Sequence, residues 1–170
     1  MVILFSDRKS VVEKEIISIL TNFGATYISD KRVICGNTPI TVIGVYKKTD
    51  LNIKKGVAVM LGVTNRFKEQ KFTNSIIGIC ESSDKEAVEI FSKSPIAVIS
   101  CGMGTKNTVT VSSIKENTAL VTFQRNLTDI YGKTIEPAEY KIKLKGKYSE
   151  FSVMASTAIL LLHGINPELI

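Results

Sequence analysis

Apolar and polar positions along this 170-residue chain form short apolar runs separated by segments with helical periodicity. The apolar run Val2–Phe5 predicts a strand, and the segment after Lys9 predicts a helix that Gly24 is placed to end. Apolar residues recur at helical spacing in that segment, at Val12, Ile16, Ile19, Leu20 and Phe23. Short strands are then expected at residues 26–29, 32–35, 40–46 and 57–61, and the polar residues 64–74 predict a loop or an irregular helix.

The middle of the chain reads as a strand, a helix and a second strand. Residues 75–80 and 96–101 are apolar runs with little alternation, which is typical of buried strands in a parallel sheet. Between them, Ser83 and Glu86 fit a capping box with Ser83 as the N-cap, and Pro95 closes the helix. A strand–helix–strand unit predicts parallel neighbours, in the same sheet as Val2–Phe5.

The pattern changes to antiparallel β-structure after Gly102. Residues 108–114 and 119–124 alternate around a turn at 115–117, which predicts a hairpin, and residues 133–144 continue the β character. Residues 151–162 form a final helix rich in small residues, ended by Gly164. The predicted fold class is α/β, with a mostly parallel sheet flanked by helices and an antiparallel hairpin extension, in a single domain over residues 1–170.

The turn after the first strand carries the most informative candidate chemistry. Lys9 and Ser10 stand immediately before a helix, as in a phosphate-binding loop of the form G-x-x-x-x-G-K followed by Ser or Thr. The glycines of that pattern are absent, although the backbone needs them to turn its N–H groups toward phosphates. A second glycine-rich turn at residues 102–108 contains Lys106, but a β-segment follows it, which favours a turn into a hairpin over a second phosphate loop. It remains a candidate wall of a pocket at the carboxyl ends of the strands.

Composition bears on whether the chain binds nucleic acid, a metal ion or a membrane. The net charge of +6 comes without a long basic run, which favours solvated faces over a nucleic-acid surface, although Phe123, Gln124, Arg125 and Tyr131 are candidates for base stacking. Three cysteines lack metal-ligand spacing, and Cys80 and Cys101 fit buried strand positions. His163, the single histidine, is expected to end the last helix with a favourable dipole contact. No signal peptide or membrane span is predicted, so we expect a cytoplasmic protein.

The order of these elements resembles the central, ATP-binding domain of the Mur ligases, which join amino acids to a carboxylate of peptidoglycan precursors through an acyl phosphate. Four further segments carry the resemblance besides the first strand and helix: 79–84, 94–102, 146–156 and 162–165. They are similar to a strand with an acidic turn, a strand ending in glycine, an alanine-rich helix start and the end of that helix. The resemblance implies an α/β fold and a site for ATP and magnesium.

Residue by residue, the resemblance carries over little of the catalytic apparatus. The phosphate loop retains only Lys9 and Ser10, which in an intact loop contact the terminal phosphates and magnesium. Tyr148 and Ser149 replace a His-Asn pair near the nucleotide base, and Asp84 is the one aspartate kept of two. The family's Asp-His after a Thr-Asn strand end is missing, because 64–65 are followed by Arg-Phe-Lys.

These observations favour a non-catalytic binding or regulatory module derived from a Mur-ligase-like domain, in cell-wall precursor metabolism, over an enzyme. No cofactor or metal is then expected, and the partner is an unidentified protein or small molecule, with neither nucleic acid nor a membrane expected. The alternative is an ATP-binding enzyme domain with an unorthodox nucleotide site formed by Lys9, Ser10, Asp84 and Lys106, together with magnesium.

Overall fold

The computed structural model describes residues 1–62 and 65–168. Its helices are α1 (Val11–Asn22), α2 (Lys85–Ser92), α3 (Glu150–Leu162) and the short 3₁₀ turn η1 (Asn65–Phe67). Its strands are β1 (Val2–Phe5), β2 (Thr26–Ile28), β3 (Val33–Ile34), β4 (Thr41–Val45), β5 (Gly56–Met60), β6 (Ile76–Glu81), β7 (Ala97–Cys101), β8 (Val109–Lys115), β9 (Thr118–Phe123), β10 (Leu127–Thr128), β11 (Thr134–Ile135) and β12 (Ala138–Lys143). Thr64, the first residue of the predicted loop, lies outside the described residues.

A ten-stranded mixed sheet runs in the order β12-β9-β8-β7-β6-β5-β1-β4-β2-β3. The strands from β2 through β4, β1, β5, β6 and β7 to β8 are parallel neighbours. The pairs β8–β9, β9–β12 and β2–β3 are antiparallel. The predicted fold class is therefore confirmed, including the parallel β6–α2–β7 unit in one sheet with β1 and the hairpin of the second half.

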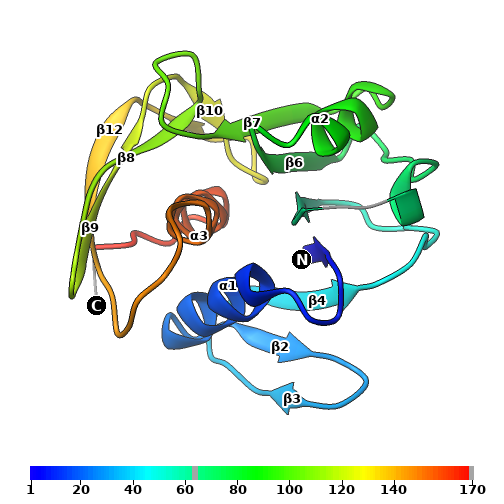
Figure 1. The fold of residues 1–170 in the computed structure, drawn as a ribbon, viewed down its shortest axis with the longest axis horizontal. Helices are drawn as coiled ribbons and strands as arrows, with labels where there is room; N and C mark the ends of the chain where they lie inside the picture. The colour runs from blue at the N-terminus through cyan, green and yellow to red at the C-terminus, as the bar shows by residue number, and fades with distance from the viewer. Residues whose placement is uncertain (63–64, 169–170) are drawn as a thin grey trace.

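Two hydrophobic cores lie on opposite faces of this sheet. The larger core packs α1 and α3 against the strands, with Ile16, Leu20 and Ile159 fully buried. Figure 1 shows α3 in the hollow of the curved sheet, with β8, β9 and β12 bending around it and α1 beside it. Ala155 and Ala158 belong to the helix that the sequence predicts to be rich in small residues, and their small side chains permit that close packing.

The smaller core is aromatic and covers the other face of the sheet. Phe5 of β1 meets Phe67 and Phe72 edge-on, with ring centroids 5.3 and 5.5 Å apart, and Phe72 also contacts Phe91 of α2. Phe67 and Phe72 belong to the segment that the sequence predicts only as a polar loop or irregular helix. Its two aromatic residues instead anchor the connection from β5 to β6 against the sheet.

Two local predictions differ from the structure. Asp84, not Ser83, is the N-cap of α2: its Oδ1 accepts a hydrogen bond from the backbone N–H of Ala87 at 3.0 Å. The helix begins one residue later than the capping box implies, so Ser83 is left exposed outside it. The predicted burial of residues 96–101 holds for one face of β7 only, because α2 packs on β6 and leaves Val98 40% exposed.

Helix ends follow the sequence more closely. Gly24 and Gly164 have φ of +79° and +72°, and they follow the ends of α1 and α3 as predicted.

No helix in the described parts of the chain is long and apolar enough to cross a membrane.

Candidate functional site

The carboxyl ends of the parallel strands β2, β4, β1, β5 and β6 form the edge at which such sheets bind ligands. The connection from β1 leads to α1, on the face of the larger core. The connection that follows β4 places Leu51 and Ile53 against the smaller core, on the opposite face. The connections that follow β1 and its neighbour β4 therefore leave the sheet on opposite faces. A cavity lies on each side of residues 6–10.

One cavity, called here the Lys9 cavity, lies on the β5 side of these residues. Its volume is about 610 Å³, and its polar lining consists of Asp7, Lys9, Ser10, Glu81, Ser149 and Glu150. Three carboxylates thus line it against one ammonium group, and Asp7 also forms a long, exposed ion pair with Arg66 at 3.8 Å. In the chain outside residues 63–64 and 169–170, no cluster of three or more Asp, Glu, His or Cys residues could hold a metal ion.

The backbone of residues 6–10 does not form a phosphate cradle. A cradle of consecutive N–H groups needs residues that alternate between right- and left-handed conformations, and residues 6–10 all have negative φ. The N–H of Ser6 donates to the Val45 carbonyl at 3.2 Å, and that of Ser10 donates to the Asp7 carbonyl at 2.9 Å. Ser10 is the N-cap of α1, and its Oγ accepts from the N–H of Glu13 at 3.1 Å.

The N-terminus of α3, which borders the same cavity, is bound by a carboxylate of α1. Glu15 Oε2 accepts hydrogen bonds from the backbone N–H of Ser149 at 3.0 Å and from the hydroxyls of Ser149 and Ser152, both at 2.6 Å. Burial raises the pKa of Glu15, but these hydrogen bonds outweigh it, so the pKa lies below its ordinary value. The negative charge that a helix N-terminus attracts is therefore already supplied from within the chain.

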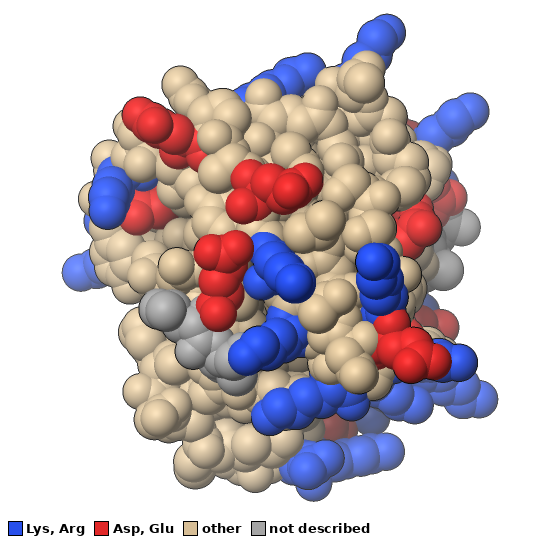
Figure 2. Space-filling model, turned by 90° about the vertical axis from the view of Figure 1, so that its left-hand side faces the viewer, with Lys and Arg blue, Asp and Glu red and all other residues tan. Residues whose placement is uncertain are grey.

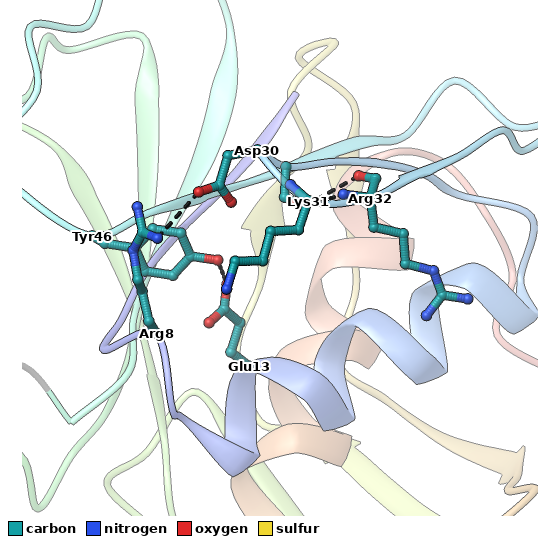
Figure 3. Close-up of polar contacts among 7 residues, drawn as sticks. Arg8, Glu13, Asp30, Lys31, Arg32 and Tyr46 are labelled. Atoms are coloured by element: carbon teal, nitrogen blue, oxygen red, sulfur yellow. Dashed lines mark hydrogen bonds and ion pairs between the residues drawn. The ribbon is translucent and has the colours of Figure 1, made fainter.

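A second cavity, called here the Tyr46 cavity, lies on the β4 and β2 side of residues 6–10 and has a volume of about 210 Å³. Its floor is the buried carboxyl group of Glu13, which accepts from Ser6 Oγ at 2.6 Å and from the Tyr46 hydroxyl at 2.9 Å. Burial raises the pKa of Glu13 in spite of these hydrogen bonds. Figure 3 shows Arg8 beside the Tyr46 ring and Lys31 directed from the β2–β3 turn toward Glu13 and Tyr46.

The structure brings together only part of the predicted nucleotide site. Lys9 and Ser10 line the Lys9 cavity, whereas Asp84 and Lys106 do not. Asp84 caps α2, and Lys106 lies in the turn before β8, where its backbone carbonyl accepts from Arg125 Nη2 at 2.9 Å. The glycine-rich turn at 102–108 likewise contributes no residue to the lining of this cavity.

Tyr148 and Ser149, at the positions where the resemblance implies contacts to a nucleotide base, hold α1 and α3 together instead. The Tyr148 hydroxyl lies 3.1 Å from Ser18 Oγ of α1, and Ser149 is both the N-cap of α3 and a hydrogen-bond donor to Glu15. In this chain both residues therefore serve the packing of α1 against α3.

Sequence reasoning missed Glu13 and Glu15, the two carboxylates that organise this edge. Glu13 carries a signal, because Ser10 and Glu13 have the spacing of a capping box. The Glu13 side chain, however, turns to Ser6 and Tyr46 instead of reaching back to the N-cap. Glu15 has no local signal, because its partners lie more than 130 residues away along the chain.

The other candidate residues have structural places. Cys80 and Cys101 are buried as predicted, which raises the pKa of Cys80 to about 12 and that of Cys101 well above its ordinary value. His163 ends α3 as predicted: its Nδ1 contacts the Ile159 carbonyl at 2.8 Å, and burial lowers its pKa, so the contact is that of a neutral ring. Phe123 is buried in the larger core, so its ring is not exposed for base stacking, whereas Tyr131 is 59% exposed.

The face of the molecule that β9 and β12 form carries both acidic and basic side chains. Figure 2 shows Lys and Arg side chains intermixed with Asp and Glu there, with more basic side chains toward the lower edge of the view. The exposed Lys141 and Lys143 alternate with the buried Ile142, which is the pattern of a strand with one solvated face. Such interspersed charge is typical of an ordinary solvated surface.

Comparison with known proteins finds similar folds among solved structures but no similar sequences. No protein-family model matches the sequence, and no curated protein matches it significantly. Solved structures do match, and three of them superpose on 99% of the chain. They are the UDP-N-acetylmuramate:L-alanyl-gamma-D-glutamyl-meso-diaminopimelate ligase from Neisseria meningitides (TM-score 0.59, 11% identity, 62% of that chain covered), the UDP-N-acetylmuramoylalanyl-D-glutamyl-2,6-diaminopimelate–D-alanyl-D-alanyl ligase from Acinetobacter baumannii (0.56, 12%, 45%) and MurF from Acinetobacter baumannii (0.55, 13%, 44%).

The chain has a Mur-ligase-like fold. At 11–13% identity the likeness extends to the fold alone, and the chain spans about half the length of the ligases it matches. The resemblance noted from the sequence is thereby confirmed at the level of a Mur ligase domain.

Proposed function

We propose that this chain is a non-catalytic binding or regulatory module with a Mur-ligase-like fold. The observation that carries the proposal is the charge of the Lys9 cavity, where Asp7, Glu81 and Glu150 stand against Lys9. A nucleotide triphosphate brings several negative charges of its own. Carboxylates can favour a nucleotide when they hold its magnesium ion, but within residues 1–62 and 65–168 no group of three or more Asp, Glu, His or Cys residues could hold a metal ion. Without such an ion the carboxylates repel the nucleotide, and one lysine does not compensate for that repulsion.

The backbone supports the same proposal. An intact phosphate loop supplies a row of N–H donors, each worth about 1.5–3 kcal/mol when it meets a charged group. Here the N–H groups of Ser6 and Ser10 are bonded within the chain, and residues 6–10 have no left-handed conformation to orient the others. The residues present therefore do not fit ATP with magnesium, and we derive no catalytic step through them.

A place in cell-wall precursor metabolism belongs to the same proposal. The structures that share this fold are named as ligases acting on UDP-N-acetylmuramate derivatives. A domain that keeps their fold without a nucleotide site is suited to bind a protein or a small molecule of that pathway in the cytoplasm. The fold likeness is the support for this part of the proposal.

An assay of nucleotide turnover tests the proposal. The chain incubated with Mg-ATP, with and without muramoyl-peptide substrates of the ligases, is expected to release phosphate no faster than buffer does. The alternative, an ATP-dependent enzyme domain with an unorthodox site, has one observation in its favour: Lys9 and Ser10 do line a cavity at the carboxyl ends of the strands. Turnover that Lys9→Ala abolishes would establish that alternative and end the proposal.

A further inference from the structure

The Tyr46 cavity differs in charge from the Lys9 cavity, although residues 6–10 border both. Four cationic side chains line it, Arg8, Lys14, Lys31 and Arg32, against the carboxyl groups of Asp30 and Glu13. Both oxygens of Glu13 already accept hydrogen bonds, and its burial disfavours the charged form. The excess positive charge attracts an anion to this side of the loop.

The Arg8 guanidinium is held in place before any ligand arrives. The Arg8 guanidinium lies over the Tyr46 ring at 5.1 Å from its centroid, and its Nη1 contacts Asp30 Oδ2 at 3.1 Å. The guanidinium has five N–H donors, so this ion pair leaves others to meet an incoming anion. Preorganisation of this kind lowers the entropy that binding must overcome.

The turn that carries Lys31 is also fixed. Ser29 Oγ accepts hydrogen bonds from the backbone N–H groups of Lys31 at 3.3 Å and of Arg32 at 3.0 Å, and the Ser29 N–H donates to the Arg32 carbonyl at 2.9 Å. Figure 3 shows Lys31 directed inward to Glu13 and Tyr46, whereas Arg32 extends away along α1. Arg8 and Lys31 therefore approach the cavity from opposite elements, residues 6–10 and the β2–β3 turn.

We propose that the Tyr46 cavity binds the phosphoryl group of a small phosphate monoester between Arg8 and Lys31. A monoester carries close to two negative charges at neutral pH, which matches the charge excess of the lining, and its oxygens accept from the planar guanidinium and the ammonium group. The volume of about 210 Å³ holds a phosphoryl group with a few further atoms. It is below the range of about 300–1,000 Å³ that drug-sized ligands such as nucleotides occupy.

This inference rests on the proposed binding function and deepens it by naming a ligand class. Inorganic phosphate and phenyl phosphate are the probes, added to the ¹⁵N-labelled full chain while amide chemical shifts are followed by NMR, with sodium chloride at matched ionic strength as the reference. We expect saturable shifts at Ser29, Lys31 and Arg32 with a millimolar dissociation constant that weakens as salt is raised.

Variants identify the site. Arg8→Gln and Lys31→Gln, both at exposed positions, are each expected to weaken phosphate binding about fivefold to tenfold, because each removes one charge-assisted contact. Lys9→Gln is the matched control: it removes the same charge from the neighbouring residue, which faces the other cavity, and is expected to change affinity less than about twofold.

Three results would overturn the inference: no saturable shift beyond the chloride reference, shifts that Arg8→Gln and Lys31→Gln leave unchanged, or shifts at Lys9, Ser10 and Gly62 that Lys9→Gln abolishes. The last result would also count against the proposed function, because it would place anion binding in the Lys9 cavity. The first two leave the proposed function standing, so the two failures are distinguishable.

Discussion

The contact between Glu15 of α1 and the first turn of α3 offers the sharpest test of how this edge of the sheet is built. Replacing Glu15 with Ala removes three hydrogen bonds to one carboxylate oxygen, from Ser149 N–H, Ser149 Oγ and Ser152 Oγ. Hydrogen bonds to a charged group contribute about 1.5–3 kcal/mol each, which sets an upper bound on the loss. Because Glu15 is partly exposed, water can solvate the freed groups, and we expect the free energy of unfolding to fall by about 2 kcal/mol.

Urea denaturation of the wild-type chain and of Glu15→Ala measures this loss. Glu150→Ala is the matched control, because it removes a carboxylate from the first turn of the same helix and affects only its dipole, worth about 0.3–1 kcal/mol. The pKa of Glu15 is lowered in the folded state, so its contribution is present above the ordinary value of 4.5 and is lost as the pH falls through the folded pKa.

The difference between wild type and Glu15→Ala should therefore narrow as the pH is lowered through that range. Equal losses for Glu15→Ala and Glu150→Ala, or a difference that is independent of pH, would refute the reasoning. Either result would mean that the helix dipole, and not the hydrogen bonds to Ser149 and Ser152, accounts for the effect of Glu15.

Three further predictions concern local structure. Asp84→Ala should lower the free energy of unfolding by about 1 kcal/mol through loss of the α2 cap, whereas Ser83→Ala should change it by less than about 0.5 kcal/mol in the same urea titration. Gly36→Ala should cost more than about 2 kcal/mol, because a Cβ there overlaps backbone atoms of the neighbouring segment, while Gly146→Ala, whose nearest neighbours are 3.5 Å away, should leave the melting temperature within a few degrees. Glu13→Gln should gain stability relative to wild type as the pH rises through the raised pKa of Glu13, because the wild-type carboxyl group then ionises in a buried position and the glutamine amide does not. Thermal melts that show the opposite trend would contradict this sign.

The sequence predicts the frame of the fold because the frame depends on periodicity. Apolar runs without alternation correctly indicate the parallel strands β6 and β7, and alternation around 115–117 correctly indicates the antiparallel pair β8 and β9. Gly24 and Gly164 mark the ends of α1 and α3, because only glycine adopts their positive φ without strain.

What the sequence does not predict depends on contacts between distant residues or on a single step in register. Ser83 and Asp84 are both good N-cap residues, and only the structure shows that the Ala87 N–H donates to Asp84. Phe67 and Phe72 lie in a polar stretch, and their burial follows only from the position of Phe5 beneath them.

In the candidate site, too, local sequence pattern predicts some features, whereas others depend on contacts between distant residues. Residues 6–10 could be singled out from local pattern alone, because Lys9 and Ser10 stand directly before a predicted helix, and Lys9 and Ser10 do line a cavity. The carboxylate that binds the α3 N-terminus could not, because Glu15 and Ser149 meet only in the folded chain. The opposite charges of the two cavities likewise depend on which strand each crevice borders.

Isothermal titration of the full chain with Mg-ATP tests the central claim most directly, namely that the Lys9 cavity does not hold a nucleotide. With three carboxylates in the lining and no cradle of N–H groups in residues 6–10, we expect no saturable heat below millimolar nucleotide, corresponding to a binding free energy weaker than about −4 kcal/mol. A micromolar dissociation constant that Lys9→Ala abolishes would contradict the claim and identify the chain as an ATP-binding domain.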